Sequence, residues 1–186
     1  MEVKVEISAR HCHLCRGDFV RLFGEEESLN FVRGLSVKGD FLSDKKVDVI
    51  GAKGTLKISV VGPFRERTQV ELSKSDCFFI GVKDVPLRLS GEIDGSAPVI
   101  LGFGGKKIEL DEGLIVAKRH LHVRWGELSK FGGVVSVTID GERGGRLDKV
   151  AVRESNVDEA VLHLDTDEGN AFGGSIFVCQ VENNNL

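Results

Sequence analysis

The chain has 186 residues, 41% of them hydrophobic, and a formal net charge of −4 at pH 7. This is enough apolar material to build a core without disulfides, and it contains no apolar run long enough to span a membrane. The acidic balance argues against nonspecific nucleic-acid binding, which needs a broad basic surface. Because the N-terminus lacks the pattern of a signal peptide, we expect a cytoplasmic protein with four free cysteines.

Alternation of apolar and polar residues dominates the chain and predicts about ten strands. In chain order they fall within residues 3–8, 47–62, 68–73, 98–110, 114–123, 134–142, 150–154, 160–165 and 175–182. Helical periodicity is confined to residues 16–24, 73–81 and 124–132, and each of these segments ends at a glycine. The sequence therefore predicts a mainly β protein, a sandwich or a barrel, with a few short helices.

An internal repeat links the two ends of the chain. The segment "ARHCHLCRGDFVRLFG" at residues 9–24 returns as "AKRHLHVRWGELSKFG" at residues 117–132. In both copies a His-x-His strand leads into a short helix that ends at glycine. This self-similarity indicates two related halves.

The first copy also contains two cysteines, Cys12 and Cys15. Side chains alternate across a strand, so on one continuous strand these two thiols point to opposite faces, whereas Cys15 shares a face with His11 and His13. This argues against a zinc finger and against a redox dithiol. A haem attachment motif is excluded because Arg16, not histidine, follows Cys15.

All five histidines of the chain fall in the two His-x-His pairs or in "VLHLDTDEGN", which contains His163. Two imidazoles at positions i and i+2 of a strand can converge on one ion, and zinc is the first expectation, with iron, cobalt or nickel admissible. A carboxylate ligand is expected from Glu71, which shares a strand face with Gln69. Asp165 and Asp167 are alternative candidates for the carboxylate ligand, or they serve as turn or helix-capping residues. Glu71 can also be interpreted as a solvent-exposed carboxylate on a strand.

Several separated motifs resemble one family in the same order along the chain. The segments "SARHCHL", "GPFRERTQVELS", "GLIVAKRHLHV", "DGERG" and "HLDTDEGNA" are similar to the PduL-type phosphotransacylase family, also called phosphate propanoyltransferases, from about Val3 to Phe172. The resemblance implies an enzyme that interconverts acyl-CoA plus phosphate with acyl phosphate plus CoA. No nucleic-acid or membrane partner is implied, and a homodimer is our default expectation.

The resemblance also implies a fold and a site. The expected fold is two β-barrels related by the repeat and capped by short helices, one barrel formed by residues 1–16 plus 117–186 and the other by residues 17–116. Two zinc ions between the barrels are implied, and Arg65 matches the arginine that binds phosphate. Ser8 and Asn170 match positions that contact CoA. The residues that match metal ligands are His11, His13, Glu71, His120, His122 and His163.

The chain departs from the family's pattern in three ways. Cys15 stands where serine or threonine is common, and its place on the ligand face would affect metal choice or sensitivity to oxidation. Gly169 stands where alanine is usual. The amphipathic N-terminal extension of members packaged in bacterial microcompartments is absent from the sequence, so we do not expect encapsulation by that device.

With all five histidines assigned to metal, none is left as a general base. Phosphate is already an anion at pH 7, so it can attack a thioester directly once Arg65 neutralises and aims it. Three alternatives remain open: acyl transfer through a nucleophilic Cys12 or Cys15, a metal hydrolase of thioesters or phosphoesters, and a non-catalytic β-barrel module stapled by metal.

Overall fold

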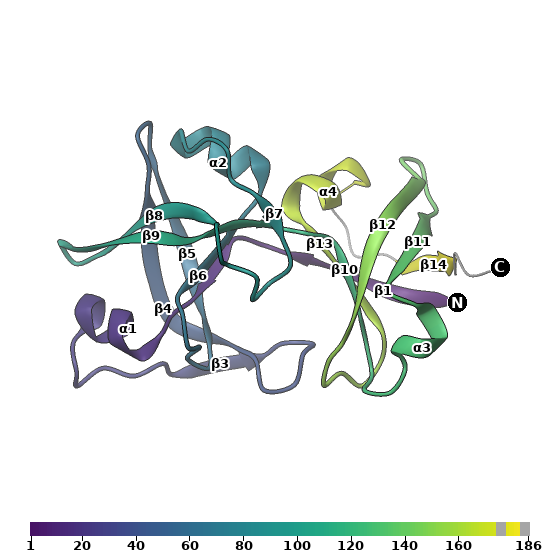
Figure 1. The fold of residues 1–186 in the computed structure, drawn as a ribbon, viewed down its shortest axis with the longest axis horizontal. Helices are drawn as coiled ribbons and strands as arrows, with labels where there is room; N and C mark the ends of the chain where they lie inside the picture. Colours follow the sequence, from purple (N-terminus) through teal and green to yellow (C-terminus); the bar gives the residue numbers. More distant parts are fainter. Residues whose placement is uncertain (174–177, 183–186) are drawn as a thin grey trace. The chain divides into compact units, whose positions relative to one another are not determined.

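Two six-stranded β-barrels carry the fold of the protein, whose computed structural model describes residues 1–173 and 178–182 (Figure 1). The expectation of a mainly β chain with two barrels and short helices is confirmed. Each barrel lies in its own compact unit and has its own apolar core, so the two are described separately.

The first barrel closes in the strand order β1, β13, β10, β12, β11, β14. Buried valines and leucines fill its core, among them Val5, Leu121, Val135 and Leu162. Of the last predicted strand, residues 175–177 lie outside the described residues. The strands are β1 (Glu2–Ser8), β10 (His120–Val123), β11 (Val134–Ile139), β12 (Gly145–Glu154), β13 (Val161–Asp165) and β14 (Val178–Glu182).

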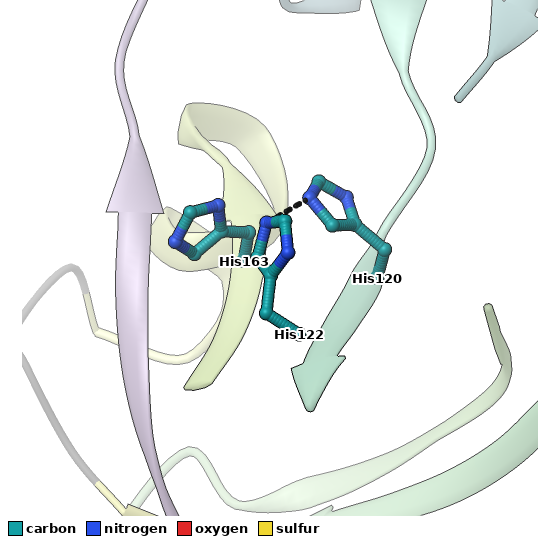
Figure 2. Close-up of side chains that lie close together, drawn as sticks. All are labelled: His120, His122 and His163. Atoms are coloured by element: carbon teal, nitrogen blue, oxygen red, sulfur yellow. Dashed lines mark hydrogen bonds between the residues drawn. The ribbon is translucent and has the colours of Figure 1, made fainter. Parts of the chain in front are cut away.

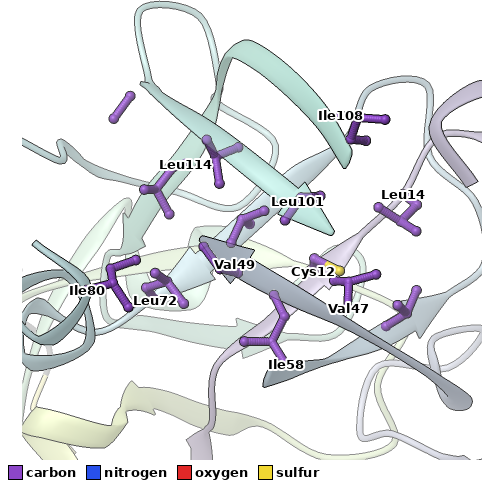
Figure 3. Close-up of a cluster of buried hydrophobic side chains, with 14 of the residues drawn as sticks. Cys12, Leu14, Val47, Val49, Ile58, Leu72, Ile80, Leu101, Ile108 and Leu114 are labelled. Carbon is purple, nitrogen blue, oxygen red and sulfur yellow. The ribbon is translucent and has the colours of Figure 1, made fainter. Parts of the chain in front are cut away.

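The second barrel closes because β8 pairs with both β4 and β9, in the order β4, β5, β2, β6, β9, β8. Gly104 and Gly105, both at positive φ, form the two-residue turn between β8 and β9. Figure 3 shows the core of this unit, which includes Cys12 and Leu101. The strands are β2 (His11–His13), β4 (Phe41–Ile50), β5 (Thr55–Gly62), β6 (Gln69–Leu72), β8 (Ala97–Phe103) and β9 (Lys106–Ala117), with β3 (Phe31–Gly34) added at β4 and β7 (Leu87–Arg88) at β9.

Four short helices occur in the described part of the chain: α1 (Arg16–Phe23), α2 (Lys74–Ile80), α3 (Leu128–Phe131) and α4 (Thr166–Ala171). The first three lie in predicted helical segments, although α3 is much shorter than predicted. The sequence did not predict α4, which Asp165 caps by accepting a hydrogen bond from the Glu168 amide. None of these helices has the length and apolarity that crossing a membrane requires.

The strand pairings show that the repeat extends through both halves of the chain. Each half runs strand, strand, helix, three strands, helix, strand, from β1 to β8 and again from β9 to β14, with β3 and β7 as additions to the first half. The pairing of β2 parallel to β5 and antiparallel to β6 recurs as β10 parallel to β12 and antiparallel to β13. The two halves exchange their first strands, since β1 completes the barrel of the second half and β9 that of the first.

The observed boundary between the units differs from the expected one near the N-terminus. The first unit comprises Met1–Ala9, Ser36–Lys38 and Lys118–Leu186, and the second comprises Arg10–Leu35 and Gly39–Ala117. Residues 10–16, which we expected with the first barrel, lie in the second unit because β2 pairs with β5 and β6. The short Ser36–Lys38 segment joins the first unit, where the Lys38 amide donates to the carbonyl of Asn156.

Candidate functional site

In the second unit, two histidines and a carboxylate meet on the paired strands β2 and β6. The register places His11 directly opposite Glu71, and Nε2 of His11 lies 3.7 Å from Oε1 of Glu71. The rings of His11 and His13 contact edge to face with 5.2 Å between their centroids. The potential ligand atoms of this trio, His11, His13 and Glu71, all lie within 4.8 Å of one another.

The first unit holds an equivalent trio of three histidines on β10 and β13. The register places His120 opposite His163, as His11 stands opposite Glu71. Figure 2 shows the three rings converging, with Nε2 of His120 and Nε2 of His122 2.9 Å apart. Their potential ligand atoms also lie within 4.8 Å of one another. The structure therefore brings together the six residues predicted as metal ligands in two trios, one in each unit.

Hydrogen bonds to Nδ1 orient two rings of the three-histidine trio, those of His120 and His122. The carbonyl of Lys118 lies 2.8 Å from Nδ1 of His120. Since a carbonyl only accepts, Nδ1 carries the proton and Nε2 presents a lone pair. The Ser155 hydroxyl lies 2.6 Å from Nδ1 of His122. This pattern, with one ring nitrogen bonded behind and the other directed inward, is typical of histidines that bind metal.

Burial keeps two of the histidines, His13 and His122, in the neutral form that binds metal. Burial, together with the neighbouring positive charge of Arg65, lowers the pKa of His13 to about 3. Burial likewise lowers the pKa of His122 to about 2, with added repulsion from His120 and His163. At neutral pH both imidazoles therefore offer a lone pair.

The residues of both trios fit a transition metal. Nδ1 of His13 and Nε2 of His163 are buried and make no hydrogen bond, although Nε2 of His163 lies 3.4 Å from Oε2 of Glu6. Buried polar atoms rarely stay unpaired, so these two nitrogens point to a missing partner. Sets of imidazole and carboxylate donors of this kind suit zinc in tetrahedral geometry. The identity and presence of the metal remain predictions.

Arg65 lies in the same unit as the trio of His11, His13 and Glu71, which we call the mixed trio. Its backbone amide donates to the carbonyl of Leu14, just beyond β2, and its Nη1 donates to the Ser90 hydroxyl at 3.1 Å. Asp40 lies 3.8 Å from its Nη2. The half-buried guanidinium is therefore held near the ligand strands, as its effect on the pKa of His13 also indicates. Its binding of phosphate remains a prediction.

Two arginines tie the ligand strands to α2 and α4. Arg10, just before β2, donates to both carboxylate oxygens of Asp76 at 2.9 and 2.7 Å. Arg119, just before β10, lies 3.0 Å from Oε1 of Glu168. Asp76 and Glu168 are the third residues of their helices, so the same clamp occurs in both halves of the repeat.

The remaining predicted residues are distributed as follows. Ser8, at the end of β1, is paired in register with Asp165, and Asn170 lies exposed on α4. Both belong to the first unit, and the structure does not test their contact with CoA. Asp165 is the cap of α4, and neither it nor Asp167 joins a trio. The capping interpretation of Asp165 is therefore confirmed.

The expected place of Cys15 on the ligand face is wrong. The strand is not continuous, because β1 ends at Ser8, and β2 ends at His13 before Cys15. Cys15 instead caps α1, where its Sγ accepts a hydrogen bond from the Asp18 amide. Cys12 is fully buried in the core, and burial raises the pKa of its thiol well above the usual range. The burial of Cys12 argues against a reactive thiolate at that position.

The sequence analysis missed the polar residues that support these trios. Ser90, in the loop between β7 and β8, contacts Arg65, and Glu6 on β1 stands opposite His163. The nearby imidazole of His163, 3.4 Å away, and a hydrogen bond from Ser36 hold the pKa of Glu6 well below its usual value, against the opposing effect of burial. Only Gln69 carried a sequence signal, since it was expected to share the strand face of Glu71.

Comparisons with known proteins match nearly the whole chain. The sequence profile of the family described as "Phosphate propanoyltransferase" matches residues 4–175. Two relatives named "Phosphate propanoyltransferase", from Alkaliphilus metalliredigens (strain QYMF) and Sebaldella termitidis (strain ATCC 33386 / NCTC 11300), are each 41% identical and aligned over 92% of this chain, covering 82% and 83% of their own lengths. A third of that name, from Clostridioides difficile (strain 630), is 37% identical over 93% of this chain and 85% of its own length.

Proposed function

The chain belongs to the phosphate propanoyltransferase family, and from this we propose that it interconverts acyl-CoA plus phosphate with acyl phosphate plus CoA at a metal-containing site. Membership of the family supports a phosphate acyltransferase activity. The finer proposal concerns which residues bind the phosphate and the metal. The observation that carries it is the position of Arg65 in the same unit as His11, His13 and Glu71.

Each trio would hold one divalent ion, with zinc the first candidate. Two neutral imidazoles and the carboxylate of Glu71 would bind one ion, and the three imidazoles of the first unit would bind the other. When bound, such ions supply Lewis acidity, which polarises a carbonyl oxygen and stabilises a departing thiolate. The buried Nδ1 of His13, which makes no hydrogen bond, supports this assignment.

The protein's own part in the reaction is to bind and aim phosphate. The planar guanidinium of Arg65 can hold two phosphate oxygens at once and offset their charge. A third phosphate oxygen attacks the thioester carbonyl, a C–O bond forms, and the C–S bond breaks. The electron pair of that bond leaves with the sulfur as CoA thiolate, and no proton has to be removed from phosphate dianion.

This scheme needs no residue as a general base and no covalent acyl-enzyme. All five histidines are committed to the trios, and Cys12 is fully buried. We therefore expect sequential kinetics through a ternary complex. Exchange of acyl groups between CoA molecules in the absence of phosphate would contradict the scheme. Ser8 and Asn170 are proposed as contacts to CoA, on the strength of the family resemblance alone.

The test is phosphate-dependent release of CoA from acetyl-CoA and propionyl-CoA by the purified protein, with its zinc content measured. Arg65→Lys keeps the charge but loses the planar fork, so we expect the KM for phosphate to rise about tenfold or more. The matched control is Arg67→Gln, since Arg67 is exposed and paired with Asp94 and Glu112. CoA release without phosphate would instead indicate a hydrolase, and no release with metal bound would indicate a stapled module.

A further inference from the structure

In each unit, two register pairs on neighbouring strands bring four side chains together, and three of the four form the trio. The two sets of four side chains differ at two positions. In the second unit, His11 stands opposite Glu71 and His13 stands opposite Gln69. In the first unit, the matching pairs are His120 with His163 and His122 with Val161. The fourth side chain, which does not belong to the trio, is therefore a polar amide in one unit and an aliphatic group in the other.

Gln69 is almost fully buried, with 1% of its surface exposed, and its amide makes three hydrogen bonds. Its Nε2 donates to Oε1 of Glu71 at 2.6 Å and to the Ser90 hydroxyl at 2.9 Å. Its Oε1 accepts a hydrogen bond from the Gly91 amide at 2.6 Å. Because the carboxylate requires a donor and the Gly91 amide requires an acceptor, these contacts fix which way the amide points.

This network reaches the arginine that we expect to bind phosphate. The Ser90 hydroxyl accepts a hydrogen bond from Nη1 of Arg65 at 3.1 Å, besides the one from Gln69. A continuous chain of hydrogen bonds therefore runs from Arg65 through Ser90 and Gln69 to Glu71. The side chain of Val161 has no atom that could make the matching contacts in the first unit.

We propose that Gln69 and Ser90 are positioning residues that hold the guanidinium of Arg65 and the carboxylate of Glu71 in one fixed arrangement, so that the phosphate and the metal ligand are aimed together. This rests on the proposed function. A long arginine side chain loses considerable conformational freedom when it is ordered, and an arginine already held by Ser90 loses less on binding phosphate. The same network orients Glu71 in the way that outer hydrogen bonds orient metal ligands.

Substitutions at Ser90 and at Gln69 remove different hydrogen bonds of this network, so we expect them to have different effects. Ser90→Ala removes the hydrogen bond between Ser90 and Arg65 and leaves the one between Gln69 and Glu71, so we expect the KM for phosphate to rise about tenfold. The KM for acyl-CoA and the zinc affinity should stay within twofold of wild type. Ser90→Thr keeps the hydroxyl and should restore the KM for phosphate. Ser43→Ala is the matched control, because the Ser43 hydroxyl donates to the Val60 carbonyl in the same barrel and does not belong to the hydrogen-bond network of Arg65, Ser90, Gln69 and Glu71.

Gln69→Leu removes the whole amide with little change in volume. We expect it to raise the KM for phosphate and also to weaken one of the two zinc equivalents about 10- to 100-fold, measured by competition with a chromogenic chelator. Thermal unfolding with and without inorganic phosphate gives a second readout, since weaker phosphate binding reduces the stabilisation that phosphate provides.

The outcomes separate this inference from the proposed function. A wild-type protein that binds zinc and releases no CoA refutes the proposed function, and the zinc affinity of Gln69→Leu then still tests the role of Gln69. If the wild type is active and both variants keep its KM for phosphate, the positioning role is refuted and the proposed function stands. Equal rises in both KM values, tracking a loss of thermal stability, would show a merely structural role.

Discussion

Acidification of the metal-free protein should destabilise it through His13. The pKa of this ring is about 3 in the folded protein, chiefly because it is buried, against about 6.5 in an unfolded chain. Between these values the unfolded state binds more protons, so stability falls as the pH drops below about 6.5 and is fully retained above it. One group with a one-proton difference loses about 1.36 kcal/mol per pH unit, or about 2 kcal/mol between pH 7.5 and pH 5.0.

The assay is urea unfolding of chelator-treated protein at these two pH values, followed by circular dichroism, with His13→Gln as the comparison. Other groups contribute to the total: burial also lowers the pKa of His122, and burial raises that of Glu168, which acts in the opposite direction. Their contributions cancel when the two proteins are compared. The variant should therefore lose about 2 kcal/mol less than wild type on acidification. Equal losses in the two proteins would refute the neutral, buried state of His13.

Four further substitutions test the packing and the role assigned to one thiol. A Cβ at Gly169 would lie 2.3 Å from Cδ1 of Ile7, so Gly169→Ala should lower the free energy of unfolding in urea by about 1–2 kcal/mol. Adding Ile7→Val removes that methyl group and should recover about 1 kcal/mol of this loss. A double-mutant cycle without coupling between the two positions would contradict the clash. Gly51→Ala should cost about 3 kcal/mol, because the new Cβ would lie 2.2 Å from the backbone oxygen of Ile80, and unchanged stability would show that the backbone yields freely. Cys15→Ala should keep kcat within about twofold and cost only the capping contact of α1, about 1 kcal/mol, whereas loss of turnover would revive a cysteine nucleophile.

The histidine pairs were predictable because their geometry is local. In His-x-His on a strand, period two alone puts both rings on one face, and the recurrence of the motif was visible in the sequence. Glu71 and His163 were harder, since their place opposite His11 and His120 depends on strand register. The equal register in the two units explains why a carboxylate in one matches a histidine in the other.

Other features left no comparable signal in the sequence. The break between β1 and β2 at Ala9 and Arg10 lacks the glycine or proline that usually marks one, so the first strand was drawn as continuous. Helix α4 contains glycine and asparagine, which have low helix propensity, and it depends on the Asp165 cap instead. Ser90 reaches Arg65 from a loop, and no periodicity relates the two residues.

The difference between the trios has an electrostatic consequence for the proposed ions. Three neutral imidazoles leave a divalent ion with its full charge, whereas Glu71 in the mixed trio offsets one of the two charges. Both trios feel a guanidinium, since Arg65 lowers the pKa of His13 and Arg153 lowers that of His122, each as a smaller effect than burial. A cation and a guanidinium repel strongly at short range where water is scarce, and a carboxylate between them reduces that repulsion. In the proposed site, Glu71 would therefore reduce the repulsion between Arg65 and a bound cation, and the hydrogen bond from Gln69 would orient its carboxylate for this.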